Sequence, residues 1–330
     1  MRIIQRIKNF DRIVRSISSE GIDYYTAAID FIYCKIRFKI KADEYFYYRF
    51  YNYQNRYRKH FILEHHRNLY RRINAHAFTR SKYAFYQYIP DLFSREIILA
   101  PQCGENAFVH FLKKHKRIVI KPDDGSSGIG IEVITYSSDQ VAKDFFSRIS
   151  SENPIICEEF IQQHPVINQL NPSSVNTIRI TSLLKDGNVE ILSATLKCSI
   201  NGNAITDNLS LGGIGAQIDI CSGIVTTLGK DFKSNVYTHH PVSKMQIIGL
   251  QIPHWDSVIS LVKEAHNRLP QCQIYGWDIA ITETGVDIVE ANSRPGCRIM
   301  QLVDGIPKGQ LLLDILKNAN LKKNDNIQNK

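Results

Sequence analysis

Residues 274–292 read IYGWDIAITETGVDIVEAN, in which two apolar runs flank a short polar segment. The runs predict strands over Gln273–Thr282 and Val286–Asn292. The Glu-Thr-Gly segment at 283–285 predicts a tight turn, because glycine and small polar residues favour turns. We therefore expect an antiparallel hairpin in this part of the chain.

Three oxygen-bearing side chains converge in this predicted hairpin. Folding it about Thr284 puts Asp278 opposite Glu290, and Asn292 points to the same face because side chains alternate along a strand. Carboxylate and amide oxygens are hard ligands that Mg²⁺ prefers, together with water and phosphate. An exposed polar face is the alternative, but the apolar neighbours indicate buried strands, where unpaired carboxylates are costly. We interpret the three residues as magnesium ligands.

A lysine and a glycine-rich loop form a second candidate group. Residues 118–130 read IVIKPDDGSSGIG, a predicted strand that reaches Lys121 and continues into small residues. Backbone N–H groups of such a loop can approach phosphate oxygens. The pattern is not a Walker A loop, and it is not a dinucleotide fingerprint, because Ile129–Thr135 predicts a strand and not a helix. The loop alone is also compatible with a simple turn. Its candidate phosphate contacts are Gly125, Ser126, Ser127 and Gly128.

An acidic pair lies near the end of the predicted strand Pro154–Ile161. Glu158 and Glu159 follow an apolar run, so they are expected to be at least partly buried. Buried glutamates need partners. An adenine amino group and a structural arginine both satisfy that requirement.

The remaining pattern mixes strands and helices without a regular alternation, which predicts an α+β fold. A helix is expected over 139–149, capped by Ser137 or Ser138, and another over 254–268. Asp186-Gly187 predicts a hairpin turn. The other predicted strands are Arg117–Lys121, Ile131–Thr135, Thr177–Leu184 and Val189–Ser199.

The N-terminal region is basic and aromatic. Residues 2–17 place apolar side chains at helical spacing with arginine and lysine between them, which predicts a basic amphipathic helix. This helix can lie on an acidic membrane surface or pack on the rest of the protein, which is the commoner arrangement. Residues 24–88 contain few glycines or prolines and predict packed helices. No RNA-binding signature accompanies the aromatic residues, so we expect no nucleic-acid partner.

The composition is that of a globular protein. The chain has 330 residues, 43% of them hydrophobic, and a formal net charge of +9 that lies largely before residue 120. Its seven cysteines lack metal-binding spacing, which indicates reduced thiols. No apolar run suits a membrane span or a secretory signal. We expect a cytoplasmic protein with a disordered tail at 321–330.

The order of these motifs resembles that of the ATP-grasp superfamily. Lys121 with its loop comes first, followed by the strand with Glu158, and then by Asp278 with Glu290-x-Asn292. Further segments look like the sugar-transfer-associated ATP-grasp family, which is found with genes for cell-surface polysaccharides. These segments are Asn176-Thr177-Ile178-Arg179, Asp207-Asn208, Gly212-Gly213-Ile214 and Gly276-Trp277-Asp278-Ile279-Ala280.

The resemblance implies how the chain is divided. An ATP-grasp region would occupy 78–320, in which two α+β subdomains clasp ATP. The nucleotide-clasping subdomain would cover about 116–200, and the metal-binding, catalytic subdomain about 201–320. A helical region over 1–77 would precede them.

The same resemblance implies roles for individual residues. ATP and two Mg²⁺ ions are the implied cofactors, with the ions held by the hairpin trio. Arg179, Lys197 and Arg294 would act on the transferred phosphate, the carboxylate substrate or the intermediate. A simple turn at Asp186-Gly187 puts Arg179 and Lys197 on opposite faces, so either a bulge intervenes or one of them is structural. The implied nucleotide contacts are Lys82, Lys121, the residues of the 125–128 loop, Glu158, Glu159, Phe160, Ile161 and Asn208.

The implied reaction is an ADP-forming ligation of a carboxylate and an amine through an acylphosphate. It would modify a cell-surface polysaccharide or its precursor with an amino acid or amine, so the partners would be a small-molecule or glycan carboxylate and an amine. The basic N-terminal region adds a peripheral contact with the inner face of the membrane or with glycan-assembly enzymes. Two alternatives are a kinase that phosphorylates a sugar hydroxyl and a non-catalytic nucleotide-binding component of a glycan-assembly complex.

Overall fold

The computed structural model divides the chain into two compact units. The sheet unit comprises His76–Gly229 and Tyr237–Pro295, and the helical unit comprises Met1–Ala75, Lys230–Val236 and Gly296–Lys330. The residues that the structure describes are 2–18, 21–52, 61–63, 73–74, 81–125, 128–149, 153–202, 206–233, 235–296 and 298–317.

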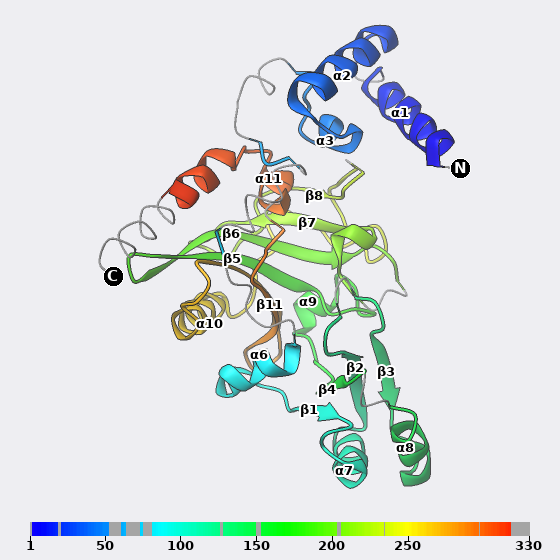
Figure 1. Ribbon diagram of the computed structural model, residues 1–330, viewed down its shortest axis with the longest axis vertical. Coiled ribbons are helices and arrows are strands. Elements are labelled where there is room, and N and C mark those ends of the chain that lie inside the picture. The colour runs from blue at the N-terminus through cyan, green and yellow to red at the C-terminus, as the bar shows by residue number, and fades with distance from the viewer. Residues whose placement is uncertain are drawn as a thin grey trace, which may run out of the picture. The chain divides into compact units, whose positions relative to one another are not determined.

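A four-stranded antiparallel sheet, in the order β1-β4-β2-β3, forms one part of the sheet unit. α7 (Glu105–His115) and α8 (Asp139–Phe146) pack against it (Figure 1). Ser138 caps α8, since its hydroxyl accepts a hydrogen bond from the Val141 N–H at 3.2 Å. The core between helices and sheet includes Phe108, Leu112, Ile118, Ala142 and Cys157. The strands are β1 (Ile97–Ala100), β2 (Arg117–Pro122), β3 (Glu132–Thr135) and β4 (Ile155–Glu159).

A second sheet has seven strands in the order β11-β10-β5-β6-β7-β8-β9. Its apolar face is covered by α10 (Trp255–Arg268), whose Val258 and Val262 are fully buried in the same core as Ile180 and Leu196 of the sheet (Figure 1). The strands are β5 (Thr177–Lys185), β6 (Asn188–Ser199), β7 (Gly213–Ile218), β8 (Gly229–Lys230), β9 (Val236–Tyr237), β10 (Ile274–Ile281) and β11 (Val286–Asn292). The shorter helices of the unit are α6 (Lys82–Tyr88), η2 (Pro90–Leu92), α9 (Pro165–Asn168) and η3 (Leu209–Leu211).

A β-bulge between Asp278 and Ile279 sets the register of the β10–β11 hairpin. Between the turn and the bulge, Ile281 pairs with Val286, so this part of the hairpin is centred between Glu283 and Thr284. On the other side of the bulge, Asp278 pairs with Glu290. The predicted pairing is therefore confirmed, although the turn is centred half a residue earlier than predicted. The extra residue of the bulge makes up the difference.

A second bulge lies between Thr181 and Ser182 in the β5–β6 hairpin. Because of it, Arg179 and Lys197 lie on one face of the sheet. Asp278 lies on the same face, since it pairs directly with Arg179 across β10 and β5. Of the two alternatives that the sequence left open, the structure shows the bulge.

The predicted α+β class is confirmed, and the predicted strands agree with the structure to within two residues at each end. The helix expected over 139–149 ends as an α-helix at Phe146, because the N–H groups of Arg148 and Ile149 bond three residues back and tighten the last turn. The two sheets divide between 159 and 177, because β5 pairs with β10 of the larger sheet.

The helical unit contains α1 (Arg2–Ser18), α2 (Tyr24–Phe38), α3 (Ala42–Tyr47) and α11 (Arg298–Asp304). The helix predicted over 2–17 is therefore confirmed, and its described apolar side chains pack into the core of this unit. The side chains of 2–7, 9 and 16 and the tail at 321–330 lie outside the described residues. No helix in the described part of the chain is long and apolar enough to span a bilayer. The core includes Ile13, Val14 and Ile17 of α1, Phe31 and Cys34 of α2, and Tyr45 of α3.

Candidate functional site

A cavity of about 1020 Å³ lies in the sheet unit and is lined by residues of both sheets. Ser126 and Ser127 lie outside the described residues. Asn292 and Arg294 do not line the cavity, and Arg294 is exposed. The other predicted site residues all line it: Lys82, Lys121, Gly125, Gly128, Glu158, Glu159, Phe160, Ile161, Arg179, Lys197, Asn208, Asp278 and Glu290.

Asp278 is the centre of a charged group on the seven-stranded sheet. The Arg179 guanidinium binds its carboxylate with two bonds of 2.7 Å, and the Lys197 ammonium lies 3.1 Å from Oδ1. Burial alone would raise the pKa of Asp278, but the two cations outweigh burial and hold this pKa well below its usual range. The carboxylate is therefore charged at neutral pH.

Lys197 also binds a second acid. Its Nζ lies 3.3 Å from Oδ1 of Asp207, whose other oxygen accepts the Thr177 N–H at 2.9 Å. Burial lowers the pKa of Lys197, but Asp207 and Asp278 raise it by more. We call the residues of this group the sheet cluster: Asp207, Asp278, Glu290, Arg179 and Lys197.

Oxygen donors for a metal are present on the same face. Glu290 pairs with Asp278 across the hairpin, and Asn292 is near enough for its amide N–H to donate to Glu290 Oε1 at 2.9 Å. Two carboxylates and an amide are a donor set that suits Mg²⁺. Within the described ranges, no three His, Cys, Asp or Glu side chains form a metal site by themselves.

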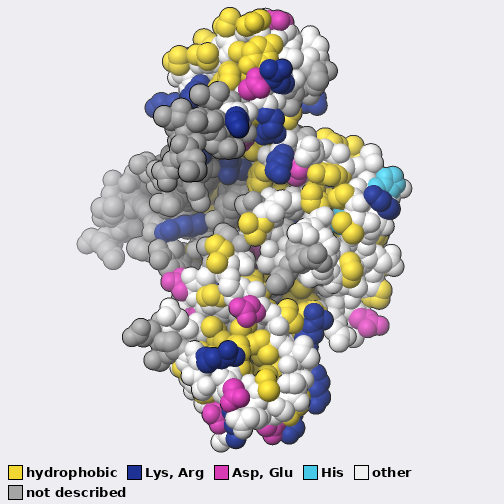
Figure 2. All heavy atoms as spheres, turned by 90° about the vertical axis from the view of Figure 1, so that its right-hand side faces the viewer, with side chains coloured by type: hydrophobic (Ala, Val, Ile, Leu, Met, Phe, Trp, Pro, Cys, Tyr) yellow, Lys and Arg dark blue, Asp and Glu magenta, His cyan; other side chains and the backbone are white. Residues whose placement is uncertain are grey.

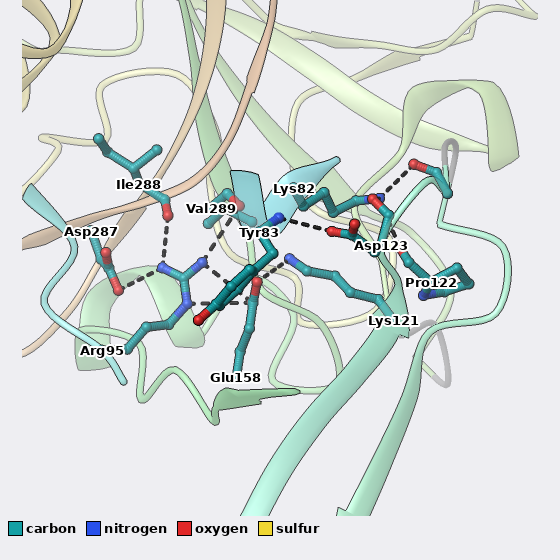
Figure 3. Close-up of polar contacts among 11 residues, drawn as sticks. Lys82, Tyr83, Arg95, Lys121, Pro122, Asp123, Glu158, Asp287, Ile288 and Val289 are labelled. Atoms are coloured by element: carbon teal, nitrogen blue, oxygen red, sulfur yellow. Dashed lines mark hydrogen bonds and ion pairs between the residues drawn. The ribbon is translucent and has the colours of Figure 1, made fainter. Parts of the chain in front are cut away.

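Arg95 joins the two sheets and was not predicted from the sequence. Its guanidinium binds Glu158 Oε2 of β4 at 3.2 Å, Asp287 Oδ2 of β11 at 2.8 Å and the Ile288 carbonyl at 2.7 Å (Figure 3). The other Glu158 oxygen accepts from Lys121 Nζ at 2.6 Å. Of the two partners considered for Glu158, the structure therefore contains the arginine. We call this group the bridge cluster: Arg95, Lys121, Glu158 and Asp287.

The buried charges of the bridge cluster compensate one another, because each acid lies in contact with a cation. Arg95, Lys121, Glu158 and Asp287 are each less than a tenth exposed. Burial raises the pKa of Glu158, but Arg95 and Lys121 lower it by more, so the net shift is downward. Glu158 is thus an anion held between two cations.

Lys82 holds the start of the glycine-rich loop. Its Nζ donates to the carbonyls of Pro122, Asp123 and Gly125 at 2.9, 3.2 and 2.6 Å (Figure 3). Burial, and then the nearby Lys121, lower the pKa of Lys82. In this arrangement Lys82 supports the start of the glycine-rich loop.

Close packing requires a glycine further along this loop. A Cβ on Gly128 would lie 2.8 Å from Thr206 Cγ2, and the φ of +76° also favours glycine. Arg117 stacks on Phe160, with its guanidinium carbon 3.9 Å from the ring centre. The cavity wall therefore includes a closely packed glycine, Gly128, and an aromatic ring, Phe160, against which Arg117 packs.

The sequence missed Arg95, Asp287 and Asp207 as members of these clusters. Asp207 could have been found, because it precedes Asn208 within a segment that was singled out. Arg95 had no such signal, since it lies outside every motif and meets its partners only in the folded sheet unit.

Comparison with protein families gives a match over most of the chain. A family described as sugar-transfer associated ATP-grasp matches residues 87–317, more than half of the chain. A search among curated proteins finds no significant match.

Several solved structures are similar to part of this chain. D-alanine-D-alanine ligase from Bacillus anthracis has 13% identity and a TM-score of 0.45, covering 75% of this chain and 69% of that one. D-alanyl-alanine synthetase A from Vibrio cholerae has 10% identity and a TM-score of 0.46, covering 72% and 64%. The ATP-grasp ligase PsnB, complexed with its minimal precursor, has 13% identity and a TM-score of 0.44, covering 72% and 60%.

Proposed function

Because the chain belongs to the sugar-transfer associated ATP-grasp family, we propose that it is an ATP-dependent, ADP-forming ligase that joins a carboxylate to an amine. The carboxylate would belong to a cell-surface polysaccharide or its precursor, and the amine to an amino acid or another small amine. The observation that carries this proposal is that one cavity holds both the sheet cluster and the bridge cluster.

ATP would bind with its phosphates between the two clusters. Lys121 and the 125–128 loop would contact the phosphates from the four-stranded sheet, and Phe160 and Ile161 would contact the base. Asp278, Glu290 and Asn292 would hold Mg²⁺, with water and phosphate oxygens completing its coordination. The metal would neutralise negative charge on the phosphates.

The first step transfers a phosphoryl group. A carboxylate oxygen of the acceptor attacks the γ-phosphorus, the bond between that phosphorus and the β,γ-bridging oxygen breaks, and ADP leaves. Arg179 and Lys197 line the cavity beside Asp278 and would stabilise the negative charge of the transferred group. The product is an acylphosphate.

The second step forms the amide. The amine nitrogen attacks the acyl carbon, inorganic phosphate leaves, and the nitrogen loses a proton. Phosphate activates the acyl group, so the reaction needs no protein nucleophile. The protein contributes orientation and charge stabilisation.

ADP release from the purified full chain tests the proposal. A panel of uronic acids and other carboxylates is combined with a panel of amino acids and amines. Release that requires one member of each panel, with an amide identified by mass spectrometry, supports a ligase. A stable phosphoester would instead identify a kinase. ATP binding without turnover across the whole panel would identify a non-catalytic nucleotide-binding component.

A further inference from the structure

Helix α2 of the helical unit is apolar on both of its faces. One face is buried in the core of the unit through Ala27, Phe31 and Cys34. The opposite face carries large apolar side chains that are 48% to 76% exposed and fall within an arc of about 100°. A surface helix normally presents a polar face to water, whereas this face presents large apolar side chains. We call it the α2 stripe: Tyr25, Ile29, Ile32, Tyr33 and Ile36.

Positive side chains border the α2 stripe. Lys35 and Arg37 are exposed, and helical geometry places them on its two sides. Lys39 and Lys41 follow the end of the helix and are also exposed. The acid in the middle of α2, Asp30, accepts the Tyr45 hydroxyl at 2.5 Å. Figure 2 shows hydrophobic side chains of the helical unit at the surface beside lysine or arginine side chains.

The charge of the whole chain is concentrated in the same region. Residues 1–75 contain 16 lysines and arginines against seven acids, which equals the full net charge of +9. The rest of the sequence is balanced. A partner of this region is therefore expected to be anionic.

We infer that the α2 stripe docks on an anionic membrane surface. The three isoleucines would enter the interface between headgroups and acyl chains, and the two tyrosines suit the same depth because their rings are apolar and their hydroxyls polar. The bordering cations would meet lipid phosphates. This inference goes beyond the ligase proposal and does not depend on it.

A second copy of the chain fits the stripe less well. Parallel pairing of two stripes would bring Lys35 and Arg37 of one copy near the same cations of the other, and like charges oppose such an interface. An anionic lipid surface removes this repulsion and adds attraction. Charge complementarity thus favours the membrane over self-association.

Vesicle sedimentation with the full chain tests the inference. The protein should bind vesicles of phosphatidylcholine mixed with phosphatidylglycerol, bind weakly to phosphatidylcholine alone, and dissociate as salt is raised. The double substitution Ile29→Glu and Ile36→Glu should lower the partition coefficient by about a hundredfold or more, because both apolar contacts are lost. Val242→Glu, at a side chain 52% exposed in the sheet unit, is the matched control and should bind normally.

A fluorescent variant gives a readout that does not depend on the charged substitutions. Ile29→Trp should show a blue shift on binding the mixed vesicles and quenching by brominated lipids, whereas Val242→Trp should show neither. Failure of the unmodified protein to bind, or equal binding by the double variant with unchanged circular dichroism, would overturn the inference. Dimerisation in light scattering that the double variant abolishes would overturn it in favour of a second copy.

Nucleotide turnover separates this inference from the ligase proposal. The double variant and the Ile29→Trp variant leave the cavity intact, so both should release ADP in solution at the rate of the unmodified protein. Loss of vesicle binding with retained turnover supports the docking surface alone. Membrane binding by a protein without ligase activity would leave the docking surface standing.

Discussion

The sheet cluster and the bridge cluster line one cavity but are held together in different ways. Members of the sheet cluster on β5, β6, β10 and β11 are placed by strand pairing within one sheet. The bridge cluster forms only because Arg95 reaches β4 of one sheet and β11 of the other. The first is therefore fixed by local register, whereas the second depends on how the two sheets close together.

Because of this difference, we expect substitutions in the two clusters to have different effects on the reaction and on stability. A conservative change in the sheet cluster should alter the reaction and leave the fold intact. A change in the bridge cluster should affect nucleotide binding and stability together, because buried charges on both sheets lose a common partner.

The largest effect is expected for Glu290→Gln. The substitution keeps the size of the side chain but removes a charge that we propose for Mg²⁺ binding, so ATP turnover should fall by about a thousandfold or more. Turnover and thermal melting are measured together. The melting temperature should stay near that of the unmodified protein, because Glu290 is only half-buried.

The exposed acid Glu264 offers a matched control for this substitution. Glu264→Gln changes an ion pair with Arg268 on the surface and should leave turnover unchanged. Normal turnover by Glu290→Gln would refute the metal assignment.

Arg95→Met is expected to have the next largest effect. It leaves Glu158 and Asp287 buried without their shared cation, which should lower the free energy of unfolding by about 3–5 kcal/mol. Urea denaturation measures this change, and the KM for ATP should rise in the folded variant. Arg268→Met, at an exposed arginine with two acidic partners, should change stability little.

Arg95→Lys sharpens the test. A lysine keeps the charge but cannot bind Glu158, Asp287 and the Ile288 carbonyl with one planar group, so it should recover only part of the lost stability. Full recovery by lysine would show that charge alone, without the bridging geometry, accounts for the role of Arg95.

Lys121→Met tests the side of the bridge cluster that faces the cavity. Loss of a charged contact to phosphate should raise the KM for ATP by about tenfold to a hundredfold, with a smaller change in kcat. Steady-state kinetics at varied ATP measures the split. The double variant with Glu158→Gln controls for the acid that has lost one of its two cations, and should show a similar KM. An unchanged KM in both variants would exclude a phosphate contact for Lys121.

The sequence predicted most strands and one pairing of the sheet cluster, because strand periodicity and turn residues are local signals. Asp278 opposite Glu290 follows from the hairpin spacing, even though the bulge at Asp278 was not foreseen. Whether Arg179 and Lys197 lie on the same face of the sheet could not be decided from the sequence. The same residues allow either a regular or a bulged pairing of β5 with β6.

The bridge cluster was less accessible to prediction. Arg95 lies 63 positions from Glu158 and 193 from Ile288, so no local spacing connects them. Lys82 was expected near the nucleotide, and the structure places its ammonium group on the carbonyls of the glycine-rich loop. Contacts of this kind arise from the packing of separate elements and leave no periodic signal in the chain.

The smallest predicted effect is on the pH dependence of stability, and it concerns Glu158 of the bridge cluster. The pKa of Glu158 in the folded protein lies below its ordinary value of 4.5, although burial opposes this shift, because Arg95 and Lys121 favour the charged form. The charged carboxylate therefore stabilises the fold above about pH 4.5, and this contribution is lost as the pH falls through the folded pKa.

Glu158→Gln should remove that contribution. At neutral pH the variant should be less stable by about 1–3 kcal/mol, and the difference from the unmodified protein should shrink as the pH falls below about 4.5. Melting temperatures measured from pH 7 to acid follow the change. Glu159→Gln is the matched control, because this neighbouring carboxylate is 41% exposed and its loss should change the melting temperature at neutral pH little. A gap between Glu158→Gln and the unmodified protein that stays constant with pH would mean that the charge of Glu158 does not stabilise the bridge.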